Sequence, residues 1–201
     1  MEKVKSIKRP RGIFPSLPGG MDRVIKIYMD GFRSKNALPQ ELAKGNFDGI
    51  GLFPDQAKLD KWRNWRTGLR YEDRESGSVL SGALDDLLVK DGRYIPFDYK
   101  TKGSPTTEEA ATLYYQNQID CYALLLKENS LPPADFAFLL YYSPKTVMEN
   151  GQVHFEIQPI RLSVDPERAR ITFRAAIALL NQSEPSANHG CEYCSWFLKK
   201  T

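Results

Sequence analysis

The first regular pattern along the chain is a run of apolar residues at helical spacing. It predicts a helix over residues 21–33 with one buried stripe. The preceding residues, 1–20, are rich in Lys, Arg, Pro and Gly and lack the apolar content to pack by themselves. We therefore expect a basic, Pro- and Gly-rich arm over 1–20 and a single domain over 21–201. The stripe comprises Val24, Ile25, Ile27, Tyr28 and Phe32.

Glycine and proline interrupt the pattern after this helix. Residues 36–59 are expected to be mostly loop, with a helical turn at 40–44. Residues 60–69 then predict a short helix that ends at a glycine and carries Trp62 and Trp65 on one face. Two interpretations of this pair stay open: the indoles cover the core, or they stack on nucleic-acid bases.

The middle of the chain changes to the pattern of strands. Residues 79–89 alternate imperfectly, and a second strand is expected over 94–99. The Asp-Gly dipeptide between them is strongly associated with tight hairpin turns. The two strands are therefore predicted to be antiparallel neighbours, which brings Asp85 and Asp98 side by side near one end.

A long helix, two more strands and a last helix follow. Thr106 with Glu109 indicates a capping box that begins a helix running to about residue 128. Strands are predicted over 136–142 and 152–162, and an Asp-Pro pair opens a helix over 165–181. This order indicates an α/β fold, with a small mixed sheet flanked by helices and a helical amino-terminal part. The long helix is expected to turn inward Ala111, Tyr115, Gln118, Tyr122, Leu124, Leu125 and Leu126.

Two acidic residues and a lysine lie where the two predicted hairpin strands meet. Asp85 and Asp98 are suited to bind one Mg²⁺ or Mn²⁺, because these ions prefer carboxylate, carbonyl and water oxygens. Lys100 is two residues beyond Asp98 and so points to the same strand face, where it would orient an attacking water. The alternative is an internal Asp–Lys ion pair. Asp86 points to the opposite face and is expected to be structural.

Two polar residues on the long helix are expected to face the two aspartates and the lysine. Gln118 and Tyr122 are four residues apart and therefore lie on one helix face. A glutamine within an otherwise apolar stripe needs a partner if it is buried. From this position both side chains can reach the lysine, the metal or a substrate phosphate, and an incidental glutamine is the alternative.

These motifs together resemble those of the PD-(D/E)XK nuclease superfamily, and more narrowly its RecB-like branch, which includes CRISPR-associated RecB-like exonucleases. The order of strands and helices agrees with that family over residues 77–180, which implies a restriction-endonuclease-like core. By this resemblance Asp85, Asp98 and the carbonyl of Tyr99 are metal ligands, and Lys100 is the catalytic lysine. It further implies that Gln118 and Tyr122 contact DNA and steady the site. The matching series is Gly82-x-x-Asp85, Asp98-Tyr99-Lys100-Thr101 and Gln118-x-x-x-Tyr122.

The sequence departs from that branch at one metal ligand. Many members carry a histidine on a helix upstream of the first aspartate, but the two histidines here, His154 and His189, both lie downstream. Glu41 is a candidate replacement, and a solvated surface carboxylate is the alternative. His154, on a predicted strand, is expected to be a hydrogen-bonded histidine rather than a ligand.

A second departure concerns cysteine. Cys191 and Cys194 have the spacing of a pair found in members with an iron–sulfur cluster, but two thiolates cannot hold a cluster that needs four, so none is expected. Three interpretations stay open: a remnant of a lost cluster, part of a zinc site with His189, or two small apolar residues at the end of the core. The third cysteine, Cys121, is expected to be buried.

Charge and hydropathy add little to this picture. The formal net charge of +3 is too small to name a partner. Basic residues and tryptophans interleave at Trp62, Arg63, Trp65 and Arg66, which fits phosphate contact and base stacking on a single DNA strand, or equally a solvated face. No apolar run approaches the roughly 20 residues that cross a bilayer, and the polar, basic start predicts no secretory signal. We expect a cytoplasmic protein.

Taken together, these features predict a Mg²⁺- or Mn²⁺-dependent deoxyribonuclease that hydrolyses phosphodiester bonds. The resemblance implies a role in DNA repair, recombination or CRISPR-related processing. The alternative is a catalytically silent protein that binds nucleic acid or another protein on the same scaffold.

Overall fold

The computed structural model describes residues 16–43, 47–183, 186, 190–191 and 194–195. Most of the predicted basic arm and His189 lie outside these residues. The helices are α1 (Ser16–Arg33), α2 (Gln40–Ala43), α3 (Gln56–Arg63), α4 (Glu108–Glu128) and α5 (Pro166–Leu180). The strands are β1 (Gly51–Leu52), β2 (Leu69–Glu72), β3 (Val79–Gly82), β4 (Asp86–Lys90), β5 (Arg93–Thr101), β6 (Phe136–Val147) and β7 (Val153–Ser163).

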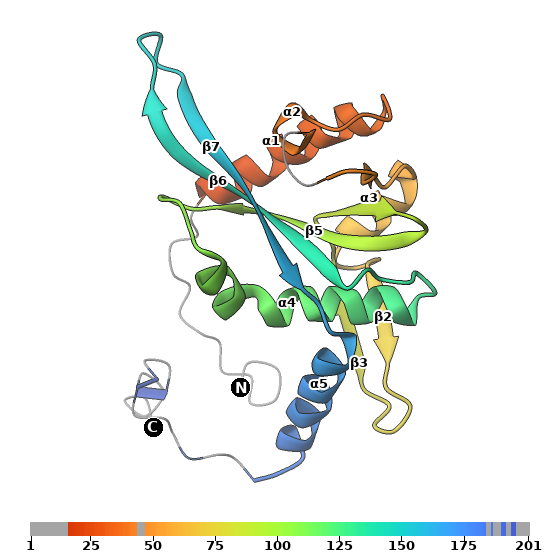
Figure 1. Cartoon of the computed structure of the whole chain (residues 1–201). Coiled ribbons are helices and arrows are strands. Elements are labelled where there is room, and N and C mark those ends of the chain that lie inside the picture. Colours follow the sequence, from red (N-terminus) through yellow and green to blue (C-terminus); the bar gives the residue numbers. More distant parts are fainter. Residues whose placement is uncertain (1–15, 44–46, 184–185, 187–189, 192–193, 196–201) are drawn as a thin grey trace.

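A mixed five-stranded sheet forms the centre of the molecule, with the strand order β1-β4-β5-β6-β7. Strands β5 and β6 are parallel, and the other neighbouring pairs are antiparallel. Parallel neighbours need a long crossover connection, and α4 lies within it. Strands β2 and β3 form a separate antiparallel ribbon beside α4 (Figure 1). The predicted α/β fold with a mixed sheet flanked by helices is confirmed.

Helices cover the sheet on both faces, with α1 on one side and α4 on the other (Figure 1). Side chains of β6 alternate between the two layers: Phe138 and Leu140 join the core cluster beneath α1, whereas Ala137 and Leu139 join the cluster beneath α4. On β5 the same alternation sends Tyr99 to the α1 side and Asp98 to the α4 side.

The first helix differs from its prediction in two ways. It begins at Ser16, so residues 16–20 are helical and do not belong to an arm; Pro18 is tolerated because it lies in the first turn. The buried positions are Ile25, Met29 and Arg33, whereas Val24 and Ile27 are exposed. Phe32 is half-buried against the same core, so the predicted stripe was right at Ile25 and Phe32, wrong at Val24, Ile27 and Tyr28, and missed Met29.

The predicted helix over 60–69 was wrong at both ends. The side chain of Asp55 caps the first turn by accepting a hydrogen bond from the Lys58 amide, so α3 begins at Gln56. It ends at Arg63 because Asn64 adopts an extended conformation. Trp65 consequently lies outside the helix and does not share a face with Trp62.

The predicted strand over 79–89 is two strands that belong to different sheets. Strand β3 pairs with β2, whereas β4 pairs with β1 and β5. Asp85 lies in the bend between them. At Gly82 a Cβ atom would lie 2.8 Å from the side chain of Leu125, so a glycine allows β3 to approach α4 closely.

The predicted β4–β5 hairpin is confirmed. Asp91 and Gly92 both have positive φ, 48° and 73°, as a two-residue type I′ turn requires. The cap of α4 is Thr107 rather than Thr106, since the Thr107 side chain accepts a hydrogen bond from the Ala110 amide.

The inward face of α4 agrees with its prediction in part. Ala111 and residues 124–126 are buried, whereas Tyr115, Gln118 and Tyr122 are only half-buried. Cys121, expected to be buried, is also half-buried, and burial raises the pKa of its thiol.

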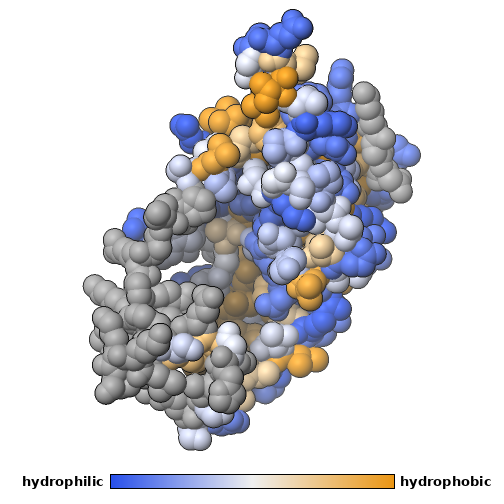
Figure 2. Space-filling view, turned by 90° about the vertical axis from the view of Figure 1, so that its left-hand side faces the viewer, coloured by the Kyte–Doolittle hydropathy of each residue, from blue (hydrophilic) through white to orange (hydrophobic). Residues whose placement is uncertain are grey.

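The hairpin of β6 and β7 extends beyond the rest of the sheet (Figure 1). Its tip exposes Val147, Met148 and Val153, and apolar atoms gather near the top of the view in Figure 2. Within the part of the chain that the structure describes, no helix is both long and apolar enough to cross a bilayer.

Candidate active site

The two aspartates and the lysine predicted from the sequence come together on the α4 side of the sheet. Asp98 lies in the interior of β5 with only 1% of its surface exposed. Lys100 Nζ lies 2.5 Å from Asp98 Oδ2, because residues two apart on a strand point to the same side. Asp85, in the bend before β4, is close enough that its carboxylate acts directly on that of Asp98.

Gln118 and Tyr122 of α4 complete this cluster from the opposite layer. Gln118 Oε1 accepts a hydrogen bond from Lys100 Nζ at 3.1 Å, and Gln118 Nε2 donates to Asp98 Oδ1 at 3.2 Å and to Tyr122 Oη at 2.7 Å. The Tyr122 hydroxyl donates to Asp98 Oδ1 at 3.5 Å. The polar residue within the apolar stripe of α4 therefore has partners at both ends of its amide group.

The electrostatics of this cluster favour a bound cation. Burial, followed by the charge of Asp85, raises the pKa of Asp98 to about 7, while Lys100 opposes the rise. Burial and the charge of Asp98 also raise the pKa of Tyr122. Two adjacent carboxylates and a main-chain carbonyl at Tyr99 are hard oxygen donors, so the residues present fit Mg²⁺ or Mn²⁺.

Within the described ranges, no further carboxylate, histidine or cysteine joins Asp85 and Asp98 in place of the missing upstream histidine. Among the described residues, no three His, Cys, Asp or Glu side chains converge as a metal site. Glu41 accepts a hydrogen bond from Tyr28 Oη at 3.1 Å and belongs to no such group, which favours the alternative of a surface carboxylate. His154 is exposed on β7, and it belongs to no such group.

The upstream helix nevertheless contributes a residue that the sequence analysis missed. Lys26 of α1 donates to Asp85 Oδ1 at 2.8 Å and to Asp22 Oδ2 at 2.9 Å. Burial works against its charged form, but Asp85 and Asp22 together raise the pKa of Lys26. The spacing Asp22-x-x-x-Lys26 is visible in the sequence, but such pairs are common on exposed helices.

A second polar network lies on the α1 side of the same strands. Asp86 is fully buried and accepts hydrogen bonds from Arg33 Nη2 at 2.6 and 2.7 Å, from Arg63 at 3.1 Å and from the Tyr99 hydroxyl. Arg63 also donates to the main-chain carbonyl of Asp85 at 2.8 Å. Asp86 thus has the structural position expected of it, and its network holds the bend that carries Asp85.

The four residues of the predicted nucleic-acid patch have different surroundings. Trp62 packs on Phe53 with ring centroids 5.3 Å apart, and Arg63 belongs to the Asp86 network. Trp65 is 73% exposed, with the Arg66 guanidinium 4.9 Å from its ring centroid. Only Trp65 and Arg66 therefore present their side chains to solvent.

The cysteine pair lies in a short described piece near the end of the chain. Cys191 Sγ accepts a hydrogen bond from the Cys194 amide at 3.2 Å, and both residues are half-buried. This contact belongs to a local turn and favours none of the three interpretations of the pair.

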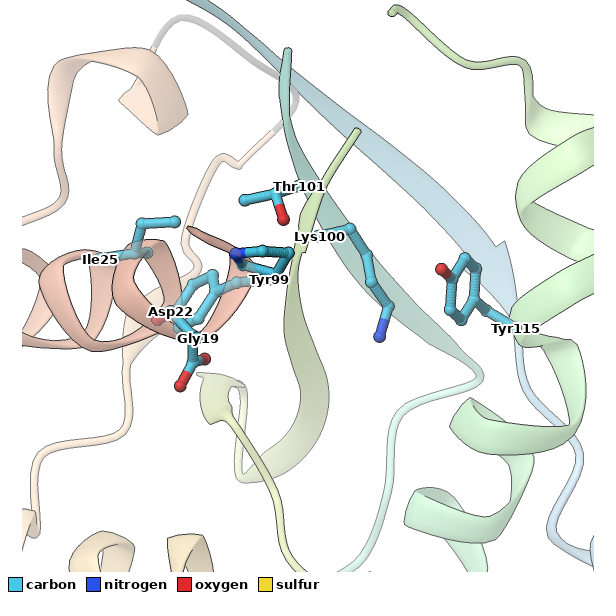
Figure 3. Close-up of a pocket in the computed structure, with 8 residues that line it drawn as sticks. Gly19, Asp22, Ile25, Tyr99, Lys100, Thr101 and Tyr115 are labelled. Atoms are coloured by element: carbon cyan, nitrogen blue, oxygen red, sulfur yellow. The ribbon is translucent and has the colours of Figure 1, made fainter. Parts of the chain in front are cut away.

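An open cavity of about 370 Å³ is lined by Lys100 of the cluster and by the Asp22 carboxylate, but not by Asp85 or Asp98 (Figure 3). Asp22 and Ile25 of α1 line one side of it, Lys100 and Thr101 lie at the end of β5, and Tyr115 of α4 lies opposite. In Figure 3 the Lys100 side chain points toward Tyr115, and its Nζ lies 4.3 Å from the ring centroid. This cavity gives access to the cluster between α1 and α4.

Comparison with known proteins places the chain in a family. A search of curated proteins finds no match. A family model described as the PD-(D/E)XK nuclease superfamily matches residues 46–197 and so covers most of the chain, including both aspartates, the lysine and the glutamine–tyrosine pair. Members of this superfamily are usually nucleases that use divalent metal ions. With the mixed sheet and the carboxylate–lysine cluster already described, this match shows that the chain belongs to the PD-(D/E)XK nuclease superfamily.

Proposed function

We propose that this protein is a Mg²⁺- or Mn²⁺-dependent deoxyribonuclease that hydrolyses phosphodiester bonds. The observation that carries the proposal is the position of Asp98, buried between Asp85, Lys100 and Gln118 beside an open cavity. An Asp–Lys pair with only a structural role has no need of a second carboxylate at its side, because two like charges destabilise a buried site.

Each residue of the cluster has a role in this proposal. Asp85, Asp98 and the Tyr99 carbonyl would hold the cation, which makes a coordinated water more acidic and offsets charge on the phosphate. Lys100 orients the attacking water, since its ammonium group lies at the carboxylate and faces the cavity. Gln118 holds the side chains of Lys100 and Asp98 in position through a hydrogen bond to each, and Tyr122 accepts a hydrogen bond from Gln118.

We assign the chain to the RecB-like branch of the superfamily on the basis of this glutamine–tyrosine pair. The pair lies four residues apart on α4 and reaches the catalytic cluster directly. A role in DNA repair, recombination or CRISPR-related processing follows from that assignment, and a cytoplasmic location is part of the same proposal.

We further propose that Trp65 and Arg66 contact a single strand of DNA. Both side chains are exposed, and a stacked aromatic with a guanidinium suits unpaired bases and phosphates. The turn that carries them is held next to the catalytic bend, because the Leu84 amide donates to the Trp62 carbonyl and Arg63 donates to the Asp85 carbonyl.

A cleavage assay with matched lysine variants tests the proposal. Wild type, Lys100→Ala and Lys145→Ala are incubated with end-labelled single- and double-stranded DNA in Mg²⁺, Mn²⁺ or EDTA. Lys145 is 57% exposed on the β6–β7 hairpin and serves as the control. We expect cleavage by wild type and Lys145→Ala, its loss in EDTA, and a fall of at least about 10²-fold for Lys100→Ala.

Two results would contradict the assignment. Full activity of Lys100→Ala would exclude the catalytic role of this lysine. DNA binding without cleavage under every condition would identify a silent binding protein on a nuclease scaffold.

A further inference from the structure

Lys26 belongs to the site by position although it belongs to none of the motifs in the sequence. Its neighbours on α1, Ile25 and Met29, are buried against the sheet, which fixes the face of the helix that Lys26 occupies. Only 22% of the Lys26 side chain is exposed, and its ammonium group bridges Asp85 and Asp22. The contact with Asp85 spans 59 residues of sequence, so tertiary packing alone creates it.

The charges around Lys26 are unbalanced without a cation and a substrate. With all three carboxylates ionised, as a bound cation would keep them, Asp22, Asp85 and Asp98 carry three negative charges, and Lys26 and Lys100 carry two positive ones. A divalent cation would turn the net charge of the cluster from minus one to plus one, and a phosphodiester group would then bring it to zero. The set of side chains is therefore matched to a cation and a phosphate together.

An ammonium group 2.8 Å from Asp85 Oδ1 competes with a divalent cation for that carboxylate. Lysine carries its charge on a flexible four-carbon stem, so the head group can leave Asp85 while Asp22, one helical turn away, still holds it. Asp22 lines the same cavity as Lys100, and the two lie on opposite sides of it (Figure 3). A lysine held at Asp22 is thus at the edge of the space that a substrate would enter.

We propose that Lys26 is a second catalytic lysine, which occupies Asp85 in the free protein and binds the scissile phosphate when a cation takes Asp85. This inference rests on the proposed nuclease function. Lys100 would then approach the phosphate from β5 and Lys26 from α1, so that the strand being cut passes between α1 and α4. Asp22 is a positioning residue, since it acts by holding Lys26.

The variant Lys26→Gln tests this role, with Lys35→Gln as the matched control. Lys35 is exposed just beyond the end of the same helix, and its variant removes the same charge. The first measurement is Mn²⁺ affinity by electron paramagnetic resonance. Removing the competing ammonium should tighten binding on the order of ten-fold in Lys26→Gln, because the cation no longer displaces a charge. Lys35→Gln should match wild type.

The second measurement is DNA affinity in Ca²⁺ as a function of salt concentration, followed by cleavage in Mg²⁺. Loss of one phosphate contact should reduce the slope of log affinity against log salt by about 0.7 to 0.9. The cleavage rate of Lys26→Gln should fall about 10²-fold. Lys35→Gln should show the wild-type salt slope of DNA affinity and the wild-type cleavage rate.

The outcomes separate this inference from the proposed function. Weaker Mn²⁺ binding by Lys26→Gln, or a salt slope equal to that of wild type, would overturn the role of Lys26 even if the protein cuts DNA. Binding of DNA by wild type without cleavage would overturn the nuclease proposal and the catalytic role of Lys26 with it, while the two binding measurements still decide whether Lys26 competes with the cation and contacts phosphate. Failure of wild type to bind DNA would overturn both.

Discussion

Two carboxylate clusters lie back to back on β4 and β5, and they differ in what completes them. On the α4 side, Asp85 and Asp98 face lysines and a glutamine beside an open cavity. On the α1 side, Asp86 is enclosed by Arg33, Arg63 and Tyr99. On β5 the pleat of the strand sends Asp98 and Tyr99 to opposite faces, and the bend before β4 separates Asp85 from Asp86.

The difference between the clusters is the one expected between a structural site and the proposed catalytic one. The carboxylate of Asp86 receives hydrogen bonds at both oxygens from groups of the protein itself. Asp98 is equally buried, and that burial together with the neighbouring Asp85 raises its pKa to about 7. A buried acid that the protein leaves in excess of its counter-charges indicates a ligand, whereas a fully paired one indicates a support.

The largest expected effect is the loss of unfolding free energy when the Asp86 carboxylate is removed. Asp86→Ala leaves Arg33 and Arg63 buried without their shared partner, which should lower the free energy of unfolding by about 3 to 5 kcal/mol. Denaturant unfolding monitored by circular dichroism measures it. Asp60→Ala, at a carboxylate that is 60% exposed, is the control. A loss below about 1 kcal/mol for Asp86→Ala would break the distinction between the clusters.

The stability of the Asp85–Asp98 cluster should instead depend on a bound cation. A cation at one hundred times its dissociation constant should stabilise wild type by about 2.7 kcal/mol, seen as a rise in Tm over the value in EDTA. Asp98→Asn should lose this rise, because it removes a proposed ligand. Asp60→Asn should keep it. An equal rise for Asp98→Asn and wild type would place the cation elsewhere.

Arg63 connects the two clusters and offers a way to test whether they are independent. Its guanidinium donates to Asp86, to Asp30 and to the Asp85 carbonyl, and a lysine ammonium cannot reproduce this fork. We expect Arg63→Lys to cost about 1 to 2 kcal/mol in unfolding free energy and to weaken cation binding several-fold. Isothermal titration with Mn²⁺ provides the second readout. Unchanged cation affinity would mean that the supporting network does not position Asp85.

The smallest effect should come from Asp73, a second carboxylate that the protein completes by itself. The Tyr71 hydroxyl lowers the pKa of Asp73 against the effect of burial, and Arg174 and Ser76 lower it further. The stabilisation from Asp73 is therefore present at neutral pH and is lost as the pH falls below its unfolded pKa of about 3.9. The Arg174 side chain that pairs with Asp73 is 39% exposed, so the stability lost when Asp73 is protonated is smaller than that lost when Asp86 is removed.

The test compares Asp73→Asn with wild type by denaturant unfolding at pH 7 and at pH 3. We expect the difference in unfolding free energy to be larger at pH 7 and to narrow at pH 3. An equal difference in unfolding free energy at pH 7 and at pH 3 would show that the Asp73 carboxylate contributes no charge-dependent stability.

Local sequence determined much of this protein. The Asp91-Gly92 turn sets the register of β4 and β5, because both residues adopt the positive φ that a type I′ turn needs. The period of two along β5 places Lys100 on the same side as Asp98. The four-residue spacing on α4 places Gln118 and Tyr122 together. These features depend on dihedral preferences and periodicity, which act over a few residues.

Only the tertiary structure decided the rest. The break between β3 and β4 depends on which distant strands pair, and the enclosure of Arg63 depends on acceptors supplied by distant segments. Lys26 reaches Asp85 because α1 packs across β5, and no periodicity within α1 specifies that neighbour. A helix face joins a carboxylate cluster through what it packs against, since side-chain contacts between distant segments follow from burial and charge pairing rather than from local conformation.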